Sequence, residues 1–373
     1  MKIRLCQLSK LISCSVLAIV IAAVLPAKAA AQSASQADVD RRVDAMLAKL
    51  TLEQKIDLIG GEEWMFIRAV PEIGLPRLKM SDGPMGVRSW GTTSGYAAGI
   101  GLAASWDTEL AHRVGAAIGQ DARARGVNFL LGPGVNIYRA PMNGRNFEYY
   151  GEDPYLAGRI AVHYIQGVQS QGVVATVKHY AGNNSEYDRH NVNSVIDERT
   201  LREIYLPAFE ASIKEGHAAS VMCAYPAIND AYSCENEFLL KQVLRQEWGF
   251  QGFVTPDYLA VHNMLPAVLA GLDVDALRGE EGHFAIKELK PAIESGKAPM
   301  PVVDEMLIRR FRTMMEMGVY DHPATLQPIP EKKDGLDALR IEPNARNLSQ
   351  LTGEEARVDM ILPQPVGHLF ERD

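Results

Sequence analysis

The sequence predicts an α/β protein, a (β/α)8 barrel of the TIM type followed by an irregular carboxyl-terminal tail. Short runs of apolar residues recur along most of the 373-residue chain, and each run is continuous rather than alternating. Continuous apolar runs are typical of parallel strands that are covered on both faces. Each run ends abruptly in polar residues and is followed by a helical stretch, which is the pattern of a βα unit. So many units favour a closed barrel over a doubly wound sheet.

The expected strands are residues 78–80, 127–131, 173–177, 219–222, 252–254 and 271–274. Two helices precede them. Residues 36–50 have amphipathic spacing, and Thr51 carries a capping signal for a helix that runs to residue 59. A crossover helix extends from Asp197 to Gly216, and Pro207 inside it predicts a kink or a local irregularity.

Residues 1–31 read as a secretory signal peptide. A basic start precedes an apolar run that is short for a membrane span, and small residues around 27–31 suit cleavage. An uncleaved anchor is the alternative. We therefore expect an exported protein, periplasmic or extracellular, with no membrane association after cleavage. The barrel is assigned to residues 32–320, and residues 321–373 to a linker and a poorly structured tail.

Charge and cysteine content exclude several classes of protein. Loss of residues 1–31 removes four basic residues and no acids, which changes the formal net charge from −8 to −12. Such an acidic chain without a basic block is a poor partner for nucleic acid or anionic membrane surfaces. Cys223 and Cys234 remain after cleavage and permit one disulfide, with two buried free thiols as the alternative. No Cys/His cluster has the spacing of a zinc site.

Charged and polar side chains follow one expected strand after another. They are Asp82, Arg145, Lys178, His179, Arg189, Tyr225 and Asp257. Taken singly, each has a plain structural explanation. Asp82 fits a Ser-Asp-Gly-Pro turn, Asp257 fits a helix N-cap, and Arg145 has Glu152 or Asp153 as ion-pair partners. Taken together they predict a ligand site, because a solvent-excluded barrel mouth is costly to charge.

Such a rim of donors and acceptors suits a polyhydroxylated substrate. Charged planar groups can bind sugar hydroxyls in pairs, and Trp90, Trp106 or Tyr258 can stack on a ring face. No glycine-rich phosphate loop follows a strand, which disfavours phosphorylated or dinucleotide ligands.

Longer motifs in the same order resemble the amino-terminal barrel domain of family 3 glycoside hydrolases, a group that includes many β-glucosidases and β-xylosidases. The similarity covers roughly residues 40–320. The matching segments are residues 80–88 (MSDGPMGVR), 132–136 (GPGVN), 144–148 (GRNFE), 152–154 (EDP), 177–180 (VKHY) with Asn183 and Asn184, 197–209 (DERTLREIYLPAF), 221–225 (VMCAY) and 247–254 (EWGFQGFV).

This resemblance implies a retaining, exo-acting β-glycosidase, β-glucosidase-like, that needs no metal or organic cofactor. Asp257 falls on the catalytic nucleophile of the family, which forms a covalent glycosyl-enzyme. Residues that fall on the innermost sugar subsite are Asp82, Arg145, Lys178, His179 and Arg189, joined by Met222, Tyr225 and Tyr258 beside the nucleophile. We expect the charges of Lys178 and Arg145 to lower the pKa of Asp257.

The sequence departs from the family pattern at two points. Pro256 and Tyr258 flank the nucleophile where the family usually has Ser and Trp, and a proline there removes an N–H and fixes φ. A retaining enzyme also needs a second carboxyl roughly 5–5.5 Å from the nucleophile. In most of the family it comes from a following sandwich domain, which is not visible in this sequence.

Single-domain relatives use a loop histidine as the acid/base instead, and the spacing of Asp188 and His190 does not match their motif. The expectation is therefore either a truncated reading frame or a separate chain or domain that supplies the acid/base. A catalytically impaired or purely sugar-binding barrel is the alternative function, and a structural protein on a barrel scaffold is a third.

Overall fold

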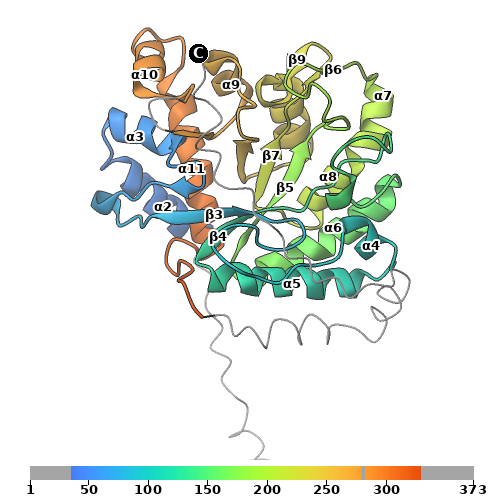
Figure 1. Ribbon diagram of the computed structural model, residues 1–373. Coiled ribbons are helices and arrows are strands. Elements are labelled where there is room, and N and C mark those ends of the chain that lie inside the picture. Colours follow the sequence, from blue (N-terminus) through green and yellow to red (C-terminus); the bar gives the residue numbers. More distant parts are fainter. Residues whose placement is uncertain (1–34, 279–281, 329–373) are drawn as a thin grey trace, which may run out of the picture. The chain divides into compact units, whose positions relative to one another are not determined.

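The computed structural model of the protein describes residues 35–278 and 282–328 (Figure 1). The chain divides into two units, Met1–Ala37 and Asp38–Asp373, and the barrel belongs to the second. The predicted signal peptide, residues 1–31, and most of the predicted tail, residues 329–373, lie outside the described residues. Both assignments remain predictions.

A six-stranded sheet forms most of the barrel, in the order β10-β7-β5-β4-β3-β2. All neighbours are parallel except β2, which runs antiparallel to β3 at the edge. The strands are β2 (Phe66–Ile67), β3 (Leu78–Asp82), β4 (Val127–Leu131), β5 (Val174–Tyr180), β7 (Ser220–Cys223) and β10 (Phe253–Pro256). Every residue of β4, β5, β7 and β10 is buried, which explains why the apolar runs do not alternate with polar residues.

A two-stranded parallel sheet of β1 (Gly60–Gly61) and β11 (Asp275–Arg278) continues from β10. Asp273 makes the connection. Its N–H donates to the Val254 carbonyl at 3.1 Å, and its carboxylate accepts the Val254 N–H at 2.7 Å. The predicted α/β barrel is therefore confirmed as a class. Within the described residues the strands depart from an ideal barrel of eight parallel strands. β2 runs antiparallel to its neighbour, and β1 consists of only two glycines.

Helices cover the outside of this sheet, with α5 and α6 below β4 and β5 in the view of Figure 1. The longer ones are α2 (Gln36–Leu47), α3 (Leu52–Ile59), α5 (Thr108–Ala124), α6 (Pro154–Gln169), α8 (Pro207–Lys214), a π-helix (Phe238–Glu247), α9 (Met264–Ala270), α10 (Ile286–Glu294) and α11 (Met300–Glu316). The short helices α4 (Gly99–Ala103) and α7 (Glu198–Thr200) lie in loops, as does a small sheet of β6 (Asn193–Ser194), β8 (Ala227–Ile228) and β9 (Ala231–Tyr232). No helix within residues 35–278 and 282–328 is long and apolar enough to cross a membrane.

Two local predictions about helices are confirmed. The Gln54 N–H donates to Thr51 Oγ1 at 3.2 Å while the Thr51 N–H donates to Gln54 Oε1 at 3.0 Å, a complete capping box at the start of α3. The irregularity expected at Pro207 is a π-helical turn, Leu201–Tyr205, between α7 and α8. A proline cannot donate the N–H that would continue the preceding helical ladder, so the chain widens by one residue there.

Two of the predicted strands differ in their bounds from the observed ones. The run at 173–177 was expected to end before Lys178, but β5 extends to Tyr180, so Lys178 and His179 belong to the strand itself. The run at 271–274 precedes β11 rather than forming it. Residues 321–328 form no helix or named strand, and the Gln327 N–H donates to the Ala124 carbonyl at the end of α5.

Candidate active site

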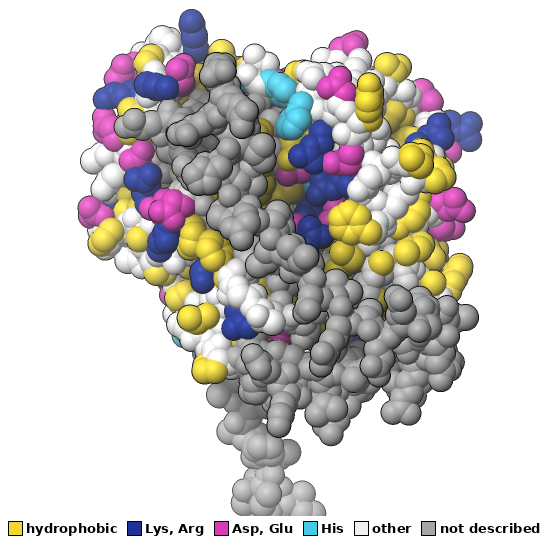
Figure 2. Space-filling model, in the orientation of Figure 1, with side chains coloured by type: hydrophobic (Ala, Val, Ile, Leu, Met, Phe, Trp, Pro, Cys, Tyr) yellow, Lys and Arg dark blue, Asp and Glu magenta, His cyan; other side chains and the backbone are white. Residues whose placement is uncertain are grey.

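The carboxyl ends of the parallel strands bring the predicted site residues together. Asp82 ends β3, Lys178 and His179 lie near the end of β5, and Met222 lies in β7. Asp257 follows β10 directly. Figure 2 shows Lys and Arg side chains gathered in a hollow on one face, with acidic and histidine side chains beside them. This is the edge at which parallel α/β barrels place their catalytic groups.

Asp257 is fixed by its backbone rather than by capping a helix. Its N–H donates to the Cys223 carbonyl at 3.0 Å, so the β7–β10 pairing continues past Pro256. The Ala260 N–H donates to the Asp257 carbonyl at 3.0 Å, and the Tyr258 N–H to Oδ1 of the carboxylate at 2.8 Å. Because α9 begins only at Met264, the helix-cap interpretation of Asp257 is excluded.

The second carboxylate oxygen of Asp257 is buried and has no hydrogen-bond partner among the described residues. Its nearest cationic and ring nitrogens are Arg145 Nη1 at 3.6 Å and His179 Nε2 at 3.5 Å. Burial raises the pKa of Asp257 above its usual range, although Arg145 and Lys178 act in the opposite direction. The expected lowering of the Asp257 pKa by these two charges is therefore outweighed by desolvation.

Asp82 has the opposite environment. Lys178 Nζ donates to Oδ1, and Arg88 Nη1 donates to Oδ2 at 2.7 Å. Burial alone would raise the pKa of Asp82, but Lys178 and Arg88 together hold it below the usual range. Asp82 is therefore an ionised hydrogen-bond acceptor, and its partner Lys178 is a nearly buried cation that is 2% exposed. The plain turn interpretation of Asp82 does not account for these contacts.

His179 is fully buried and neutral. Burial lowers its pKa far below the usual range, and Arg145 and Lys178 lower it further. The Tyr149 hydroxyl lies 3.0 Å from Nδ1 and accepts a hydrogen bond from Asn183 Nδ2 at 3.3 Å. Nε2 faces the carboxylate of Asp257 at 3.5 Å, so an imidazole N–H on Nε2 points toward this acceptor. In that tautomer the Tyr149 phenol, which burial keeps protonated by raising its pKa, can donate to Nδ1.

Arg145 does not pair with Glu152 or Asp153, the partners suggested by the sequence. Its Nε donates to Oε1 of the buried Glu148 at 2.6 Å, and Arg88 Nη2 lies 3.5 Å from the other oxygen of the same carboxylate. Asp153 caps α6 instead, where its carboxylate accepts the Leu156 N–H at 2.7 Å. Glu148 therefore anchors two arginines of the site. The i,i+3 spacing of Arg145 and Glu148 was the available sequence signal for it.

Glu186 is a second residue that sequence reasoning missed. Its Oε1 accepts from Asn183 Nδ2 at 3.1 Å, and its Oε2 accepts from Arg189 Nη1 at 2.6 Å. Arg145 Nη1 is 3.8 Å from Oε1. The guanidinium of Arg189 in turn lies over the ring of Tyr225, 4.1 Å from its centroid. These contacts bring the predicted Arg189 and Tyr225 to the same site as Asp257.

Tyr225 lies close enough to Asp257 to interact with its carboxylate. Burial raises the pKa of its phenol well above the usual range, and the nearby Asp257 carboxylate raises it further. The ring of His190 packs edge-on against Tyr225 with centroids 4.5 Å apart. Burial, followed by Arg189, lowers the pKa of His190, which limits its charge at neutral pH.

Aromatic side chains line another part of the site. Tyr258 lies with its ring centroid 5.8 Å from that of Trp64, and its hydroxyl donates to Met65 Sδ at 2.9 Å. Trp64 was not predicted. Of the two tryptophans that were, Trp90 packs on Phe66 and donates its indole N–H to the Met80 carbonyl at 2.7 Å, and Trp106 is 74% exposed. Met222 is buried in β7 opposite Thr255.

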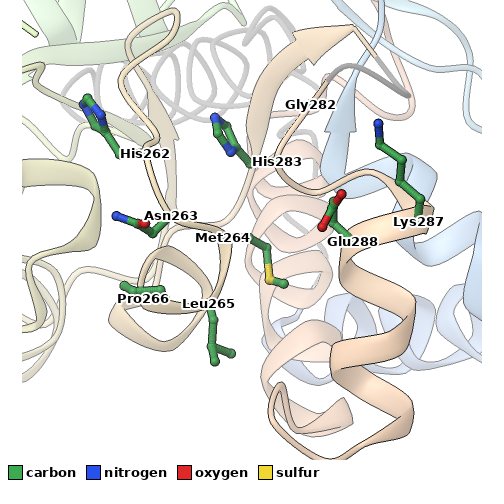
Figure 3. Close-up of a pocket in the computed structure, with 9 residues that line it drawn as sticks. All are labelled: His262, Asn263, Met264, Leu265, Pro266, Gly282, His283, Lys287 and Glu288. Carbon is green, nitrogen blue, oxygen red and sulfur yellow. The ribbon is translucent and has the colours of Figure 1, made fainter.

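Cys223 and Cys234 are joined in a disulfide with Cα atoms 5.2 Å apart. The bond connects the end of β7 to a short 3-10 helix, Ser233–Glu235, that precedes the π-helix. Nearby, a pocket of about 510 Å³ lies against the loop that follows Asp257 (Figure 3). Its lining residues include His262, Asn263 and Met264 on one side and His283, Lys287 and Glu288 on the other. Within the part of the chain that the structure describes, no three His, Cys, Asp or Glu side chains are grouped to hold a metal ion.

Comparison with known proteins adds to this geometry. Residues 68–312 match the N-terminal domain of glycosyl hydrolase family 3. A β-glucosidase of Rhizobium radiobacter is 43% identical over 267 residues, which are 69% of this chain and 33% of that enzyme. An exo-α-(1→6)-L-arabinopyranosidase of Bifidobacterium breve is 38% identical over 73% of this chain and 38% of that enzyme.

The solved structure of β-glucosidase 3B from Thermotoga neapolitana in complex with glucose superposes with a TM-score of 0.74 at 36% identity. The match covers 80% of this chain and 46% of that one. The chain therefore spans less than half the length of each of these three relatives.

Proposed function

Since the chain belongs to family 3 of the glycosyl hydrolases, we propose that it forms the nucleophile-bearing barrel of an exo-acting β-glycosidase similar to β-glucosidases. The reaction is hydrolysis of an O-glycosidic bond with retention of configuration. The observation that carries this proposal is the buried oxygen of Asp257 at the end of β10, which accepts no hydrogen bond from the described residues and lies among groups suited to sugar hydroxyls.

In this mechanism Oδ2 of Asp257 attacks the anomeric carbon. The bond from that carbon to the leaving-group oxygen breaks as the ester bond to Asp257 forms, and the acid/base gives its proton to the departing oxygen. Water then attacks the same carbon from the other face and gives a proton to the same acid/base, the ester bond breaks, and Asp257 regains its carboxylate. Two inversions give net retention.

The remaining residues hold the sugar. Asp82 is an ionised acceptor that Lys178 and Arg88 hold in place, so it can accept two sugar hydroxyls without moving. His179 presents its Nε2–H, and Arg145 and Arg189 present guanidinium donors. Binding energy from these hydroxyl contacts positions the anomeric carbon over Asp257. Tyr258 and Trp64 offer aromatic faces at the edge of the site.

The acid/base is the member of the catalytic pair that has still to be assigned to a residue. Two further described carboxylates lie next to Arg145. Glu148 is buried and its two oxygens lie against Arg145 and Arg88. Glu186 is the other, and both of its oxygens already accept hydrogen bonds, from Asn183 and Arg189. Neither oxygen is free to carry a proton to a leaving group. We therefore assign the acid/base to a segment outside the described residues, or to a separate domain or chain.

The same observation favours a second candidate function, a catalytically impaired or sugar-binding barrel. An aryl β-glucoside with a good leaving group separates the two, because such a substrate needs little acid catalysis. Steady turnover of that substrate supports the glycosidase. A burst of about one aryl group per chain without turnover supports the impaired barrel.

Covalent trapping tests the main proposal. A 2-deoxy-2-fluoro glucoside with a good leaving group should label the peptide that contains Asp257, as measured by mass spectrometry after proteolysis. Asp188→Asn is a matched control, since Asn tolerates the positive φ of 49° at that exposed position and should label normally. Labelling at another residue, or none in a folded sample that binds glucose, would overturn the assignment of Asp257.

The sugar and the site of action are further parts of the proposal. The names of the relatives include both a β-glucosidase and an arabinopyranosidase, so aryl β-D-glucoside and aryl α-L-arabinopyranoside are the substrates to compare first. We also propose that the enzyme acts after export, on the basis of residues 1–31. Fractionation of the producing cell, with sequencing of the mature amino terminus, tests this.

A further inference from the structure

The loop that follows Asp257 is held from one side by a single carboxylate, Glu235. Its Oε1 accepts the backbone N–H groups of His262 and Asn263 at 2.7 Å and 2.6 Å, and its Oε2 accepts Asn263 Nδ2 at 3.0 Å. Three donors on one carboxylate make a rigid, charge-assisted contact. In Figure 3 His262 and Asn263 line one side of the pocket, and α9 begins at the next residue, Met264.

Glu235 is itself fixed relative to the nucleophile strand. It follows Cys234, which is bonded to Cys223 at the end of β7, and the Cys223 carbonyl accepts the Asp257 N–H at 3.0 Å. The ring of Tyr232, three residues before Glu235, stacks on His262 with centroids 3.6 Å apart and an interplanar angle of 11°. Residues 223, 234, 235, 262 and 257 therefore form a closed circuit of covalent and hydrogen-bonded links around the nucleophile loop.

This circuit matters because the turn that follows Asp257 contains a strained residue. Pro256 has no N–H to donate, and Leu259 adopts a φ of 67°, which is unfavourable for a branched side chain. The direction of the carboxylate depends on the tight turn in which the Tyr258 N–H donates to Oδ1 and the Ala260 N–H to the Asp257 carbonyl. A turn with one strained residue persists only when its surroundings fix both ends.

We propose that Glu235 is a positioning residue for the nucleophile: it anchors the far end of the 257–263 loop and so sets the aim of the Asp257 carboxylate. This proposal rests on the proposed function, in which Asp257 is the nucleophile. The three hydrogen bonds of Glu235 go to His262 and Asn263, not to a group assigned to sugar binding. Its loss therefore changes the rate of attack on the anomeric carbon more than it changes sugar affinity.

The experiment compares three variants by the kinetics of covalent trapping with the activated 2-deoxy-2-fluoro glucoside. Glu235→Ala removes all three contacts, and a misaimed nucleophile should lower the maximal trapping rate by about 10²-fold. The half-saturating concentration should change less than about threefold, because the hydroxyl-binding groups are untouched. Glu235→Gln keeps one carbonyl oxygen for the two backbone N–H groups and should recover much of the rate. Glu237→Gln, whose partner is the exposed Lys241, is the matched control and should trap like the wild type.

A second measurement does not depend on activity. Amide hydrogen exchange of a peptide spanning residues 256–263 should be faster in Glu235→Ala than in the wild type or Glu237→Gln, while exchange in β4 stays unchanged. Wild-type trapping rates in Glu235→Ala, or unchanged exchange in that peptide, would overturn the role of Glu235. Faster exchange without labelling of Asp257 even in the wild type would instead contradict the proposed function and leave the anchor in place.

Discussion

Asp82 and Asp257 occupy equivalent places in the barrel, at the carboxyl ends of β3 and β10, but their surroundings are opposite. Lys178 and Arg88 donate directly to the two oxygens of Asp82. Asp257 has one oxygen bound by its own loop, and the other is buried 3.5–3.6 Å from His179 and Arg145 without a hydrogen bond. Ion pairing lowers the pKa of Asp82 against burial, and burial raises the pKa of Asp257 against its neighbours.

The difference indicates how one fold assigns two roles to the same side chain. A carboxylate held on both oxygens is a fixed acceptor and cannot form a bond without losing its partners. A carboxylate with one buried oxygen that accepts no hydrogen bond can attack through that oxygen when it is ionised, because that oxygen has no hydrogen bond to give up. We therefore assign binding to Asp82 and attack to Asp257, and the following variants test that division.

The largest effect is expected at Asp257. Asp257→Asn should lower the rate of covalent trapping by about 10⁴-fold or more, since the amide cannot form the glycosyl ester. Glucose should still raise the melting temperature of this variant, because the hydroxyl-binding groups remain. If trapping continues at a measurable fraction of the wild-type rate, the nucleophile lies elsewhere.

A smaller effect of another kind is expected at Asp82. Asp82→Asn should weaken glucose binding by about 10²-fold, measured by titration calorimetry, and should destabilise the fold by about 1.5–3 kcal/mol because Lys178 loses its charged partner. Asp153→Asn provides the control, since Asn also caps a helix such as α6. Normal glucose affinity in a folded Asp82→Asn sample would show that Asp82 is structural only.

The two carboxylates should also give stability-versus-pH effects of opposite sign. Asp82, whose folded pKa is lowered, contributes stability that is present above the unfolded value of about 3.9 and is lost as the pH falls through the folded value. Asp257, whose folded pKa is raised, contributes stability that is present below about 3.9 and is lost as the pH rises through the folded value. In urea unfolding between about pH 3 and pH 7, Asp257→Asn should gain stability relative to the wild type as pH rises, and Asp82→Asn should lose it. If the stability of both variants relative to the wild type changes with pH in the same direction, the proposed electrostatic difference between Asp82 and Asp257 is wrong.

The smallest effect is expected at Tyr225, whose phenol lowers the pKa of Asp257. In Tyr225→Phe the acid limb of the trapping rate should move to higher pH by less than about one unit, and glucose affinity should change little. Tyr155→Phe, at a position 74% exposed, is the comparison variant and should leave the pH profile unchanged. A shift to lower pH would mean that the phenol does not stabilise the carboxylate.

Much of this site was predictable because strand ends can be recognised in sequence. The apolar runs before Asp82, Lys178 and Asp257 are continuous and short, and parallel strands direct their carboxyl ends to one edge. Glu148 and Glu186 were missed, although each lies three residues from an arginine that it binds. The i,i+3 spacing alone does not distinguish a catalytic support from an ordinary surface ion pair.

The sequence by itself determined the class of fold, the order of the strand ends, the capping box at Thr51, the irregularity before Pro207 and the candidate nucleophile. The first four follow from local patterns of burial, turns and proline geometry, which act over a few residues, whereas the candidate nucleophile follows from the resemblance to family 3 glycoside hydrolases. The tertiary structure decided the pKa directions of Asp82 and Asp257, the anchoring of two arginines on Glu148 and the link from Glu235 to the nucleophile loop. Desolvation and ion pairing depend on which groups meet across long separations in the chain, so only the folded arrangement fixes their sign.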